Sequence, residues 1–314
     1  MNNALTKKFS VAVSFGLINP DEYIAVLGKY KDYIHDIFFS PTESLRYQTR
    51  NRIYDFDTTS NDERRQMLGQ VLSYARSNGI ACSMTLNASM ASAEEQAEAF
   101  KSYNSLYQID QLTTTLEIGK LVREQGADIP MICSYNEAIT NRGHLLKVLD
   151  SGLFQTVVLG GRFLRDLEVF ELIKGRGIKT VLMLNTGCCM NCASFCKVRN
   201  QNYCRDLFNN NAAQMGVEAM YAAQSIFPEE IKDYYLPSGM IDIFKLASRP
   251  IDGEELDTLI ESYVSLDSKS YITRSIKNYH LYGRLAHFVP YYKDFDYERI
   301  VDMKRSLWDN KVIS

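Results

Sequence analysis

The sequence predicts an α/β fold: a TIM-like (βα)-eight barrel with a Cys-rich insertion after the seventh strand and a C-terminal extension. Eight short apolar runs are spread along the chain, and each is followed by a segment with helical periodicity or by a long insertion. The 314 residues are 46% hydrophobic and 23% charged, as in ordinary globular proteins. This composition excludes a mostly disordered chain, a collagen-like fibre and a coiled-coil rod.

Strands are predicted where β-branched and aromatic residues form short runs bounded by turn residues. The first run, for example, ends at Gly16 and the Asn19-Pro20 pair. The predicted strands cover residues 9–15, 36–41, 81–87, 108–114, 131–136, 156–160, 180–185 and 241–248. An open doubly wound sheet is the alternative, but no glycine-rich phosphate-binding turn follows the first strand.

Helices are predicted where apolar residues recur at a period of 3.6 and a polar residue or a glycine marks the end. Leu68, Val71 and Leu72 show this spacing, and Gly79 ends their segment. The predicted helices cover residues 21–30, 61–78, 92–103, 116–125, 141–150, 164–174 and 253–264. We expect residues 1–265 to form the barrel, with the Cys-rich insertion at 186–240. Residues 266–314 form an extension that covers the barrel or contacts another subunit.

The charge balance argues against nucleic acid as a partner. A net charge of −3 and a pI near 5.9 provide no basic field for a phosphate backbone. No segment approaches the roughly 20 apolar residues that span a bilayer, and residues 1–8 lack a signal-peptide core. We therefore expect a cytoplasmic protein without a membrane span that acts on a small molecule or peptide. A homologous partner subunit and a homo-oligomer are both open.

Five of the seven cysteines fall between Cys188 and Cys204, starting where the seventh strand ends. In a barrel this end of the strands carries the active site. Structural disulfides are not expected in a reducing compartment. Soft thiolates favour iron–sulfur or zinc, and irregular spacing without a nearby histidine favours a 4Fe–4S cluster. Zinc and unmetallated thiols are the alternatives. The predicted ligands are Cys188, Cys192, Cys196 and Cys204.

The other three cysteines have different predicted roles. Cys189 is the substitute ligand, because two adjacent cysteines point in different directions and rarely both bind one metal. Cys82 and Cys133 lie inside apolar strands, where a cysteine is most often a small core residue. One of these two could still point into the barrel mouth.

Polar and basic residues accompany the predicted strand ends. Lys245 and Arg249 flank the eighth strand, and they are the candidate catalytic residues because together they suit an anionic ligand. The alternative is that both satisfy backbone and helix ends. Five further residues near strand ends are candidates for binding substrate: Asn87, Asn136, Asn185, Arg142 and Arg162. The asparagines can equally cap loops. No histidine lies close enough to a strand end to be nominated as a base.

The segment N-T-G-C-C-M-N-C that starts at Asn185 resembles the N-x-G-C-x-x-x-C segment of the collagenase-like peptidase U-32 family. Residues 227–235 (F-P-E-E-I-K-D-Y-Y) and 242–250 (D-I-F-K-L-A-S-R-P) resemble the same family, in the same order. The resemblance spans residues 9–265. It implies a barrel with a 4Fe–4S cluster on four cysteines, and Cys188, Cys192 and Cys204 match the family's positions best. Many relatives carry a further cysteine where this chain has Ile226 and Phe227, so Cys196 is the expected fourth ligand.

The resemblance also implies a function. Members of this family act in oxygen-independent ubiquinone hydroxylation, with a prephenate-linked oxygen source, and others hydroxylate bases in RNA. We therefore expect an iron–sulfur enzyme that hydroxylates a small molecule or peptide with an anionic co-substrate. A peptidase-like hydrolase is one alternative, although the sequence nominates neither its base nor its nucleophile. A non-catalytic iron–sulfur partner or scaffold subunit is the other.

Overall fold

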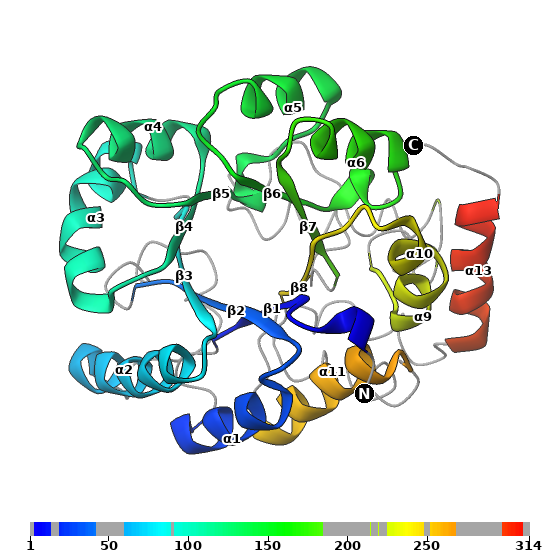
Figure 1. Ribbon diagram of the computed structural model, residues 1–314, viewed down its shortest axis with the longest axis horizontal. Coiled ribbons are helices and arrows are strands. Elements are labelled where there is room, and N and C mark those ends of the chain that lie inside the picture. Colours follow the sequence, from blue (N-terminus) through cyan, green and yellow to red (C-terminus); the bar gives the residue numbers. More distant parts are fainter. Residues whose placement is uncertain are drawn as a thin grey trace.

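The computed structural model describes residues 3–13, 19–41, 60–88, 91–184, 214, 219, 225–247, 252–267 and 297–309. Its centre is a closed barrel in which each strand pairs with the next and β8 pairs with β1 (Figure 1). Every pairing is parallel. The strands are β1 (Phe9–Ala12), β2 (Ile34–Phe39), β3 (Ala81–Leu86), β4 (Gln111–Thr114), β5 (Met131–Cys133), β6 (Thr156–Leu159), β7 (Lys179–Met183) and β8 (Ile243–Leu246).

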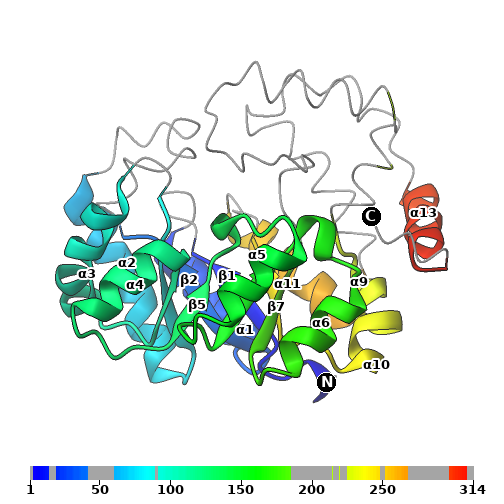
Figure 2. The same cartoon turned by 90° about the horizontal axis from the view of Figure 1, so that it is seen from above.

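Helices stand around the barrel, as the two views at right angles show (Figures 1 and 2). The α-helices are α1 (Pro20–Tyr30), α2 (Asn61–Ser77), α3 (Ala93–Tyr107), α4 (Leu116–Glu124), α5 (Arg142–Leu149), α6 (Leu167–Lys174), α9 (Pro228–Glu230), α10 (Leu236–Ser238), α11 (Gly253–Ser265) and α13 (Tyr297–Asp309). Shorter turns are η1 (Asn3–Leu5), η5 (Tyr135–Glu137) and η6 (Gly161–Phe163). The segment η7 (Ile231–Tyr235) is a π-helix between α9 and α10.

The predicted barrel is confirmed, and the pairing of β8 with β1 shows that the open sheet is wrong. Each predicted strand and helix has its counterpart. Most strands in the structure end earlier than predicted. Asn136, for example, was expected in a strand but lies in η5. Within the described ranges, none of the helices has the length and apolar character needed to cross a bilayer.

Local sequence explains why the helices start where they do. Ser60 and Ser92 each accept a hydrogen bond from the backbone N–H three residues on, and the carboxylates of Glu63 and Glu95 accept one from the N–H of the cap residue. These two capping boxes satisfy backbone donors that a helix leaves open at its first turn. In α1, Pro20 occupies the first turn, where its missing N–H costs nothing.

Apolar side chains form two separate clusters. The large cluster fills the layer between the strands and the surrounding helices. The small cluster lies within the lumen of the barrel and comprises Ile132, Val158, Val181, Met183 and Ile243. Helix α13 joins the large cluster through Ile300 and Val301, so this part of the chain after the barrel packs on the barrel's own core.

Candidate functional site

The lumen of the barrel has a polar side and an apolar side. Strands β5 to β8 contribute the small apolar cluster. Strands β1 to β4 instead contribute buried hydroxyl and carboxyl groups, and two pairs of these bond across neighbouring strands. Ser10 donates to Asp36 at 3.0 Å, and the Ser83 and Thr113 hydroxyls lie 3.0 Å apart. These groups are buried and hydrogen-bonded to one another, so one side of the packed lumen is polar and internally paired.

Lys245 of β8 lies in this lumen and is only 7% exposed. Ile243 and Ala247, two residues before and after it, pack in the lumen cluster, and alternation along the strand places Lys245 on the same side. Its Nζ lies 3.4 Å from the centroid of the Phe38 ring on β2, a cation–π contact. Ala12 of the intervening β1 pairs with Phe38, and its small side chain leaves room for the lysine to cross. The structure thus places this candidate inside the barrel.

Ser10 and Asp36 connect the lysine's neighbourhood to His35, near the amino end of β2. Ser10 is the β1 residue in register with Lys245. The Asp36 carboxylate accepts the Ser10 hydroxyl on Oδ2, and its Oδ1 lies 3.0 Å from Nδ1 of the half-buried His35. A cation and a carboxylate therefore occupy the lumen sides of strands separated only by β1.

The cysteine-rich part of the predicted insertion, residues 185–224, is called the cysteine insertion below, and the described residues that flank it lie beside Lys245. The backbone N–H of Leu184, the last described residue before the insertion, donates to the Lys245 carbonyl at 3.0 Å. The N–H of Ile226, just after the insertion, donates to the Leu184 carbonyl at 2.9 Å. The residues that flank 185–224, Leu184 and Ile226, are thus fixed at the carboxyl ends of β7 and β8, which is the functional edge of such barrels.

Several predicted site residues lie outside the described residues. They are Asn185, Arg249 and the four predicted ligands Cys188, Cys192, Cys196 and Cys204. The backbone of Arg162 is described in η6, but its side chain is not. Among the residues that the structure does describe, no group of three or more His, Cys, Asp or Glu side chains could hold a metal ion.

Asn87 and Asn136 are brought together at the carboxyl ends of β3 and β5. The Asn87 side chain donates to the Ser134 hydroxyl at 2.7 Å, and the Asn136 side chain donates to the Asn87 carbonyl at 3.1 Å. The Ser134 hydroxyl also accepts the Asn136 backbone N–H at 3.0 Å. The two amides therefore brace the loops above β4, and the exposed Asn136 remains accessible from this edge.

Arg142 lies at the start of α5, and its guanidinium faces the start of α6. It donates to Glu168 at 2.6 Å and to Asp166 at 3.4 Å. Asp166 also accepts the Val169 N–H and so caps α6. The arginine thereby links two neighbouring helices on an exposed surface, and its predicted part in substrate binding stays a prediction.

A histidine–carboxylate pair that the sequence did not reveal lies on the same edge. Nε2 of His144 in α5 is 2.9 Å from Oε1 of Glu137, which directly follows Asn136. The other Glu137 oxygen accepts the Leu116 N–H at 2.8 Å, which fixes the carboxylate against the start of α4. A carboxylate fixed in this way orients an imidazole as a general base requires. The only sequence signal is Asn141, which caps α5 and places His144 in its first turn.

Cys82 and Cys133 are core residues, as expected. Each packs in the large cluster outside the lumen and has no exposed surface. Burial raises the pKa of the Cys82 thiol to about 12, with a further contribution from Asp110, and burial raises the pKa of Cys133 well above its ordinary value. Both thiols therefore stay protonated near neutral pH, which makes them poor nucleophiles and poor ligands.

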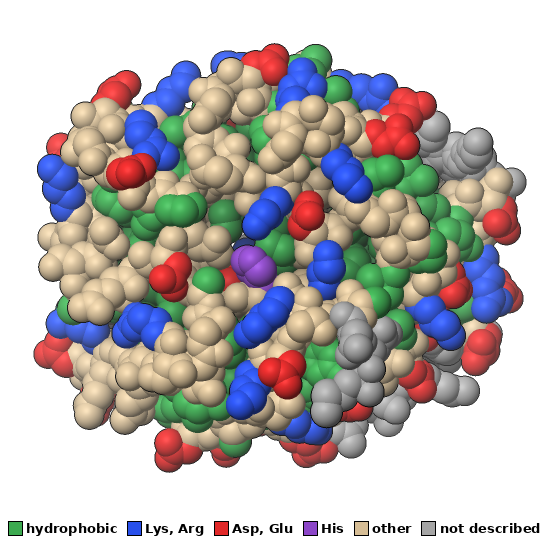
Figure 3. All heavy atoms as spheres, in the orientation of Figure 1, with side chains coloured by type: hydrophobic (Ala, Val, Ile, Leu, Met, Phe, Trp, Pro, Cys, Tyr) green, Lys and Arg blue, Asp and Glu red, His purple; other side chains and the backbone are tan. Residues whose placement is uncertain are grey.

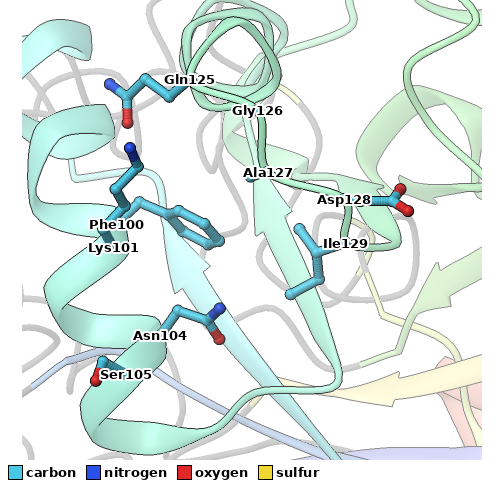
Figure 4. Close-up of a pocket in the computed structure, with 9 residues that line it drawn as sticks. All are labelled: Phe100, Lys101, Asn104, Ser105, Gln125, Gly126, Ala127, Asp128 and Ile129. Atoms are coloured by element: carbon cyan, nitrogen blue, oxygen red, sulfur yellow. The ribbon is translucent and has the colours of Figure 1, made fainter.

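A surface hollow lies away from this edge. It opens between α3 and the loop from α4 to β5, with Phe100, Asn104 and Ile129 among its lining residues (Figure 4). That loop leads into the start of β5, at the end of the barrel opposite the functional edge. On the face drawn in Figure 3, acidic and basic side chains are interspersed around a central histidine. That face carries no extended patch of a single charge.

The fold and the site together define a (βα)-eight barrel with a buried lysine at its functional edge. The structure is similar to that of the U32 peptidase Mk0906, with a TM-score of 0.47 and 11% identity over 77% of this chain and 93% of that one. It is also similar to an enolase protein from the Sargasso Sea environmental genome sequencing, with a TM-score of 0.41 and 9% identity over 83% of this chain and 57% of that one. No family model matches the sequence. No curated protein matches it either.

Proposed function

We propose that this protein is a cytoplasmic iron–sulfur enzyme that carries a 4Fe–4S cluster on Cys188, Cys192, Cys196 and Cys204. Thiolates are the ligands such clusters take, and four of them fall within one short stretch of sequence. The support from the structure lies in the described residues on either side of this stretch: Ile226 donates to the Leu184 carbonyl, and Leu184 donates to the Lys245 carbonyl.

The proposed reaction is oxygen-independent hydroxylation of a small molecule or peptide with an anionic co-substrate. Lys245 is the residue on which this proposal depends. Its charge is held in the lumen against the Phe38 ring, where low dielectric strengthens its attraction for an anion. Arg249 would add a second cation at the mouth, and Asn87 and Asn136 would orient polar groups of the substrate. Arg162 and Asn185 are proposed at the same edge.

Anaerobic purification followed by iron, sulfide and zinc analysis tests the cofactor. We expect iron and sulfide in equal amounts, near four per chain for one 4Fe–4S cluster, and a broad absorbance from thiolate-to-iron charge transfer. Stoichiometric zinc without sulfide would show that the site binds zinc and holds no cluster. An absence of both metals would leave a set of free thiols.

The role of Lys245 is tested by carboxylate binding. We expect millimolar succinate or benzoate to raise the melting temperature of the wild type, and Lys245→Met to abolish this shift while leaving the iron content unchanged. Lys120→Met, an exposed lysine of α4, is the matched control and should keep the shift. If Lys245→Met keeps the full shift, the lysine does not bind the anion.

The pair of His144 and Glu137 supports a hydrolase as the second candidate. An imidazole fixed by a carboxylate at this edge supplies the general base that the sequence did not nominate. If the protein cleaves a defined peptide mixture, as read by mass spectrometry, His144→Gln should lower the rate at least 100-fold. If wild type and His144→Gln both leave the peptides intact, this candidate fails. A cluster-bearing protein that neither binds a carboxylate through Lys245 nor cleaves peptides would instead be a non-catalytic partner or scaffold subunit.

A further inference from the structure

A buried cluster of charged residues joins α13 to the chain just after the cysteine insertion. The Glu230 carboxylate is its centre. One oxygen accepts two hydrogen bonds from Arg165, at 2.9 and 2.7 Å, and one from Trp308 Nε1 at 2.9 Å. The other oxygen accepts from Lys304 Nζ and from the Phe227 backbone N–H, both at 2.9 Å. A carboxylate with this many donors is fully compensated despite its burial.

Arg165 and Lys304 also bind the residue that directly follows the insertion. The carbonyl of Ser225, the residue that follows position 224, accepts hydrogen bonds from Arg165 and from Lys304. Nζ of Lys304 also lies 4.2 Å from the centroid of the Phe227 ring. Helix α13 thus contacts three residues of the turn between Ser225 and Glu230, although they are far from it in sequence. Both views of the fold place α13 beside α9, which contains Glu230 (Figures 1 and 2).

Lys304 occupies a position where an apolar residue would be expected. It lies one helical turn after Ile300 and one before Trp308, on the face of α13 that packs on the barrel. The side chains of Lys304 and Glu230 are 2% and 4% exposed. An apolar residue at this position would often be as stabilising or more so, whereas a buried ion pair fixes one docking geometry.

We infer that α13 is a clamp on the carboxyl-terminal end of the cysteine insertion, and that Lys304 is its positioning residue. With α13 docked, Lys304 and Arg165 both donate hydrogen bonds to the Ser225 carbonyl. With α13 displaced, Arg165 and Glu230 remain a neutral pair, so no bare charge stays in the barrel. Displacing α13 therefore costs less free energy than removing the only partner of a buried ion. This makes the clamp detachable.

The clamp has a consequence for the cofactor, and this part rests on the proposed function. Because Leu184 and Ser225, the residues that flank the insertion, are held at the barrel edge, loosening Ser225 should loosen the proposed cluster ligands. We expect a faster loss of iron, not a failure to fold, when the clamp is weakened.

The test compares Lys304→Met with Arg305→Met in the full-length chain. Arg305 is the neighbouring residue on the exposed face of α13 and pairs only with Asp302 of the same helix among the described contacts. Amide hydrogen exchange of peptides covering residues 225–231 reports the clamp directly and needs no cluster. We expect exchange there to accelerate at least tenfold in Lys304→Met and to stay unchanged in Arg305→Met. Peptides from β3 to β5 should not change in either variant.

Iron release to a chelator under anaerobic conditions is the second readout, with loss expected several-fold faster in Lys304→Met. Unchanged exchange at residues 225–231 in Lys304→Met would overturn the clamp. Faster exchange at these residues in Lys304→Met, together with a wild type that holds no iron, would support the clamp while the proposed function fails. If Lys304→Met does not fold, Trp308→Phe carries the same test, because it keeps an aromatic ring and removes the donor to Glu230.

Discussion

Glu230 shows how a single buried carboxylate can join distant parts of a chain. Burial raises the pKa of Glu230, but the charges of Lys304 and Arg165 and the Phe227 amide lower it by more, so the net shift is downward. The opposite holds for Lys304: burial lowers its pKa to about 7, with Glu230 opposing and Arg165 reinforcing this shift. Two cations share one carboxylate, and the lysine is the one that can give up its proton.

The stability of the protein should therefore depend on pH through Lys304. Its pKa is lower folded than unfolded, so between about 7 and 10.5 the unfolded chain binds more protons and the unfolding free energy rises with pH. Below about pH 7 Lys304 is protonated in both the folded and the unfolded protein, so the increase in unfolding free energy is lost. We expect wild type to gain stability over Lys304→Met from pH 7 to pH 10, measured by urea denaturation. The charged groups that shift the pKa of Lys304, which are Glu230, Arg165 and Glu229, are the same in the wild type and in Lys304→Met. A difference in unfolding free energy between the two proteins that stays constant from pH 7 to pH 10 would contradict the lowered pKa of Lys304.

The thiols of Cys82 and Cys133 should resist alkylation in the folded protein. The thiolate is the reactive species, and burial raises the pKa of both thiols far above pH 8. Iodoacetamide at pH 8, followed by peptide mass spectrometry, should leave both unlabelled until denaturant is added. Labelling of either one in the native state would show that it is accessible.

At the scale of elements, α4 packs unusually close to the strands. A Cβ added at Gly119 would lie 2.8 Å from Cδ2 of Leu153 and 3.2 Å from Cγ2 of Thr114. At Gly69, on the exposed side of α2, the same Cβ would meet nothing within 4 Å. The two glycines therefore differ only in packing, since both lie inside helices.

Replacing each glycine by alanine should change stability in opposite directions. Gly69→Ala should raise the unfolding free energy by about 1 kcal/mol, the difference in helix propensity. Gly119→Ala should lower it by about 1 kcal/mol, because overpacking outweighs the same propensity gain. Urea denaturation of both variants measures this. Equal stabilisation of the two would mean that α4 can move away from the strands without cost.

The order of elements could be predicted from the sequence because hydrophobic periodicity and glycine or proline boundaries are local signals. Strand β8 and helix α11 were found in this way. The roles of Glu230 and Lys304 could not be, because they depend on contacts between segments far apart in the chain. His144 was missed for a different reason: its partner Glu137 is close in sequence, but no sequence pattern shows that the turn before α5 brings this carboxylate to the imidazole. Lys245 was found because a lysine among apolar strand residues is conspicuous in the sequence itself.

At the scale of the whole molecule, the barrel brings three features to one edge. The cysteine insertion is anchored there, Lys245 lies in the lumen beside that anchor, and Asn87 and Asn136 bridge the loops of β3 and β5. Helix α13 then ties the outer side of this edge to the end of the insertion. In our proposal this arrangement holds a cluster beside a site for an anion.

The most direct measurement is the iron and sulfide content of anaerobically purified wild type, Cys192→Ala and Cys82→Ala. Cys82 is the matched control, because its thiol is buried in the core away from the insertion. The proposal predicts iron and sulfide in the wild type and Cys82→Ala, and the loss of both from Cys192→Ala. Full iron content in Cys192→Ala, or none in the wild type, would contradict it.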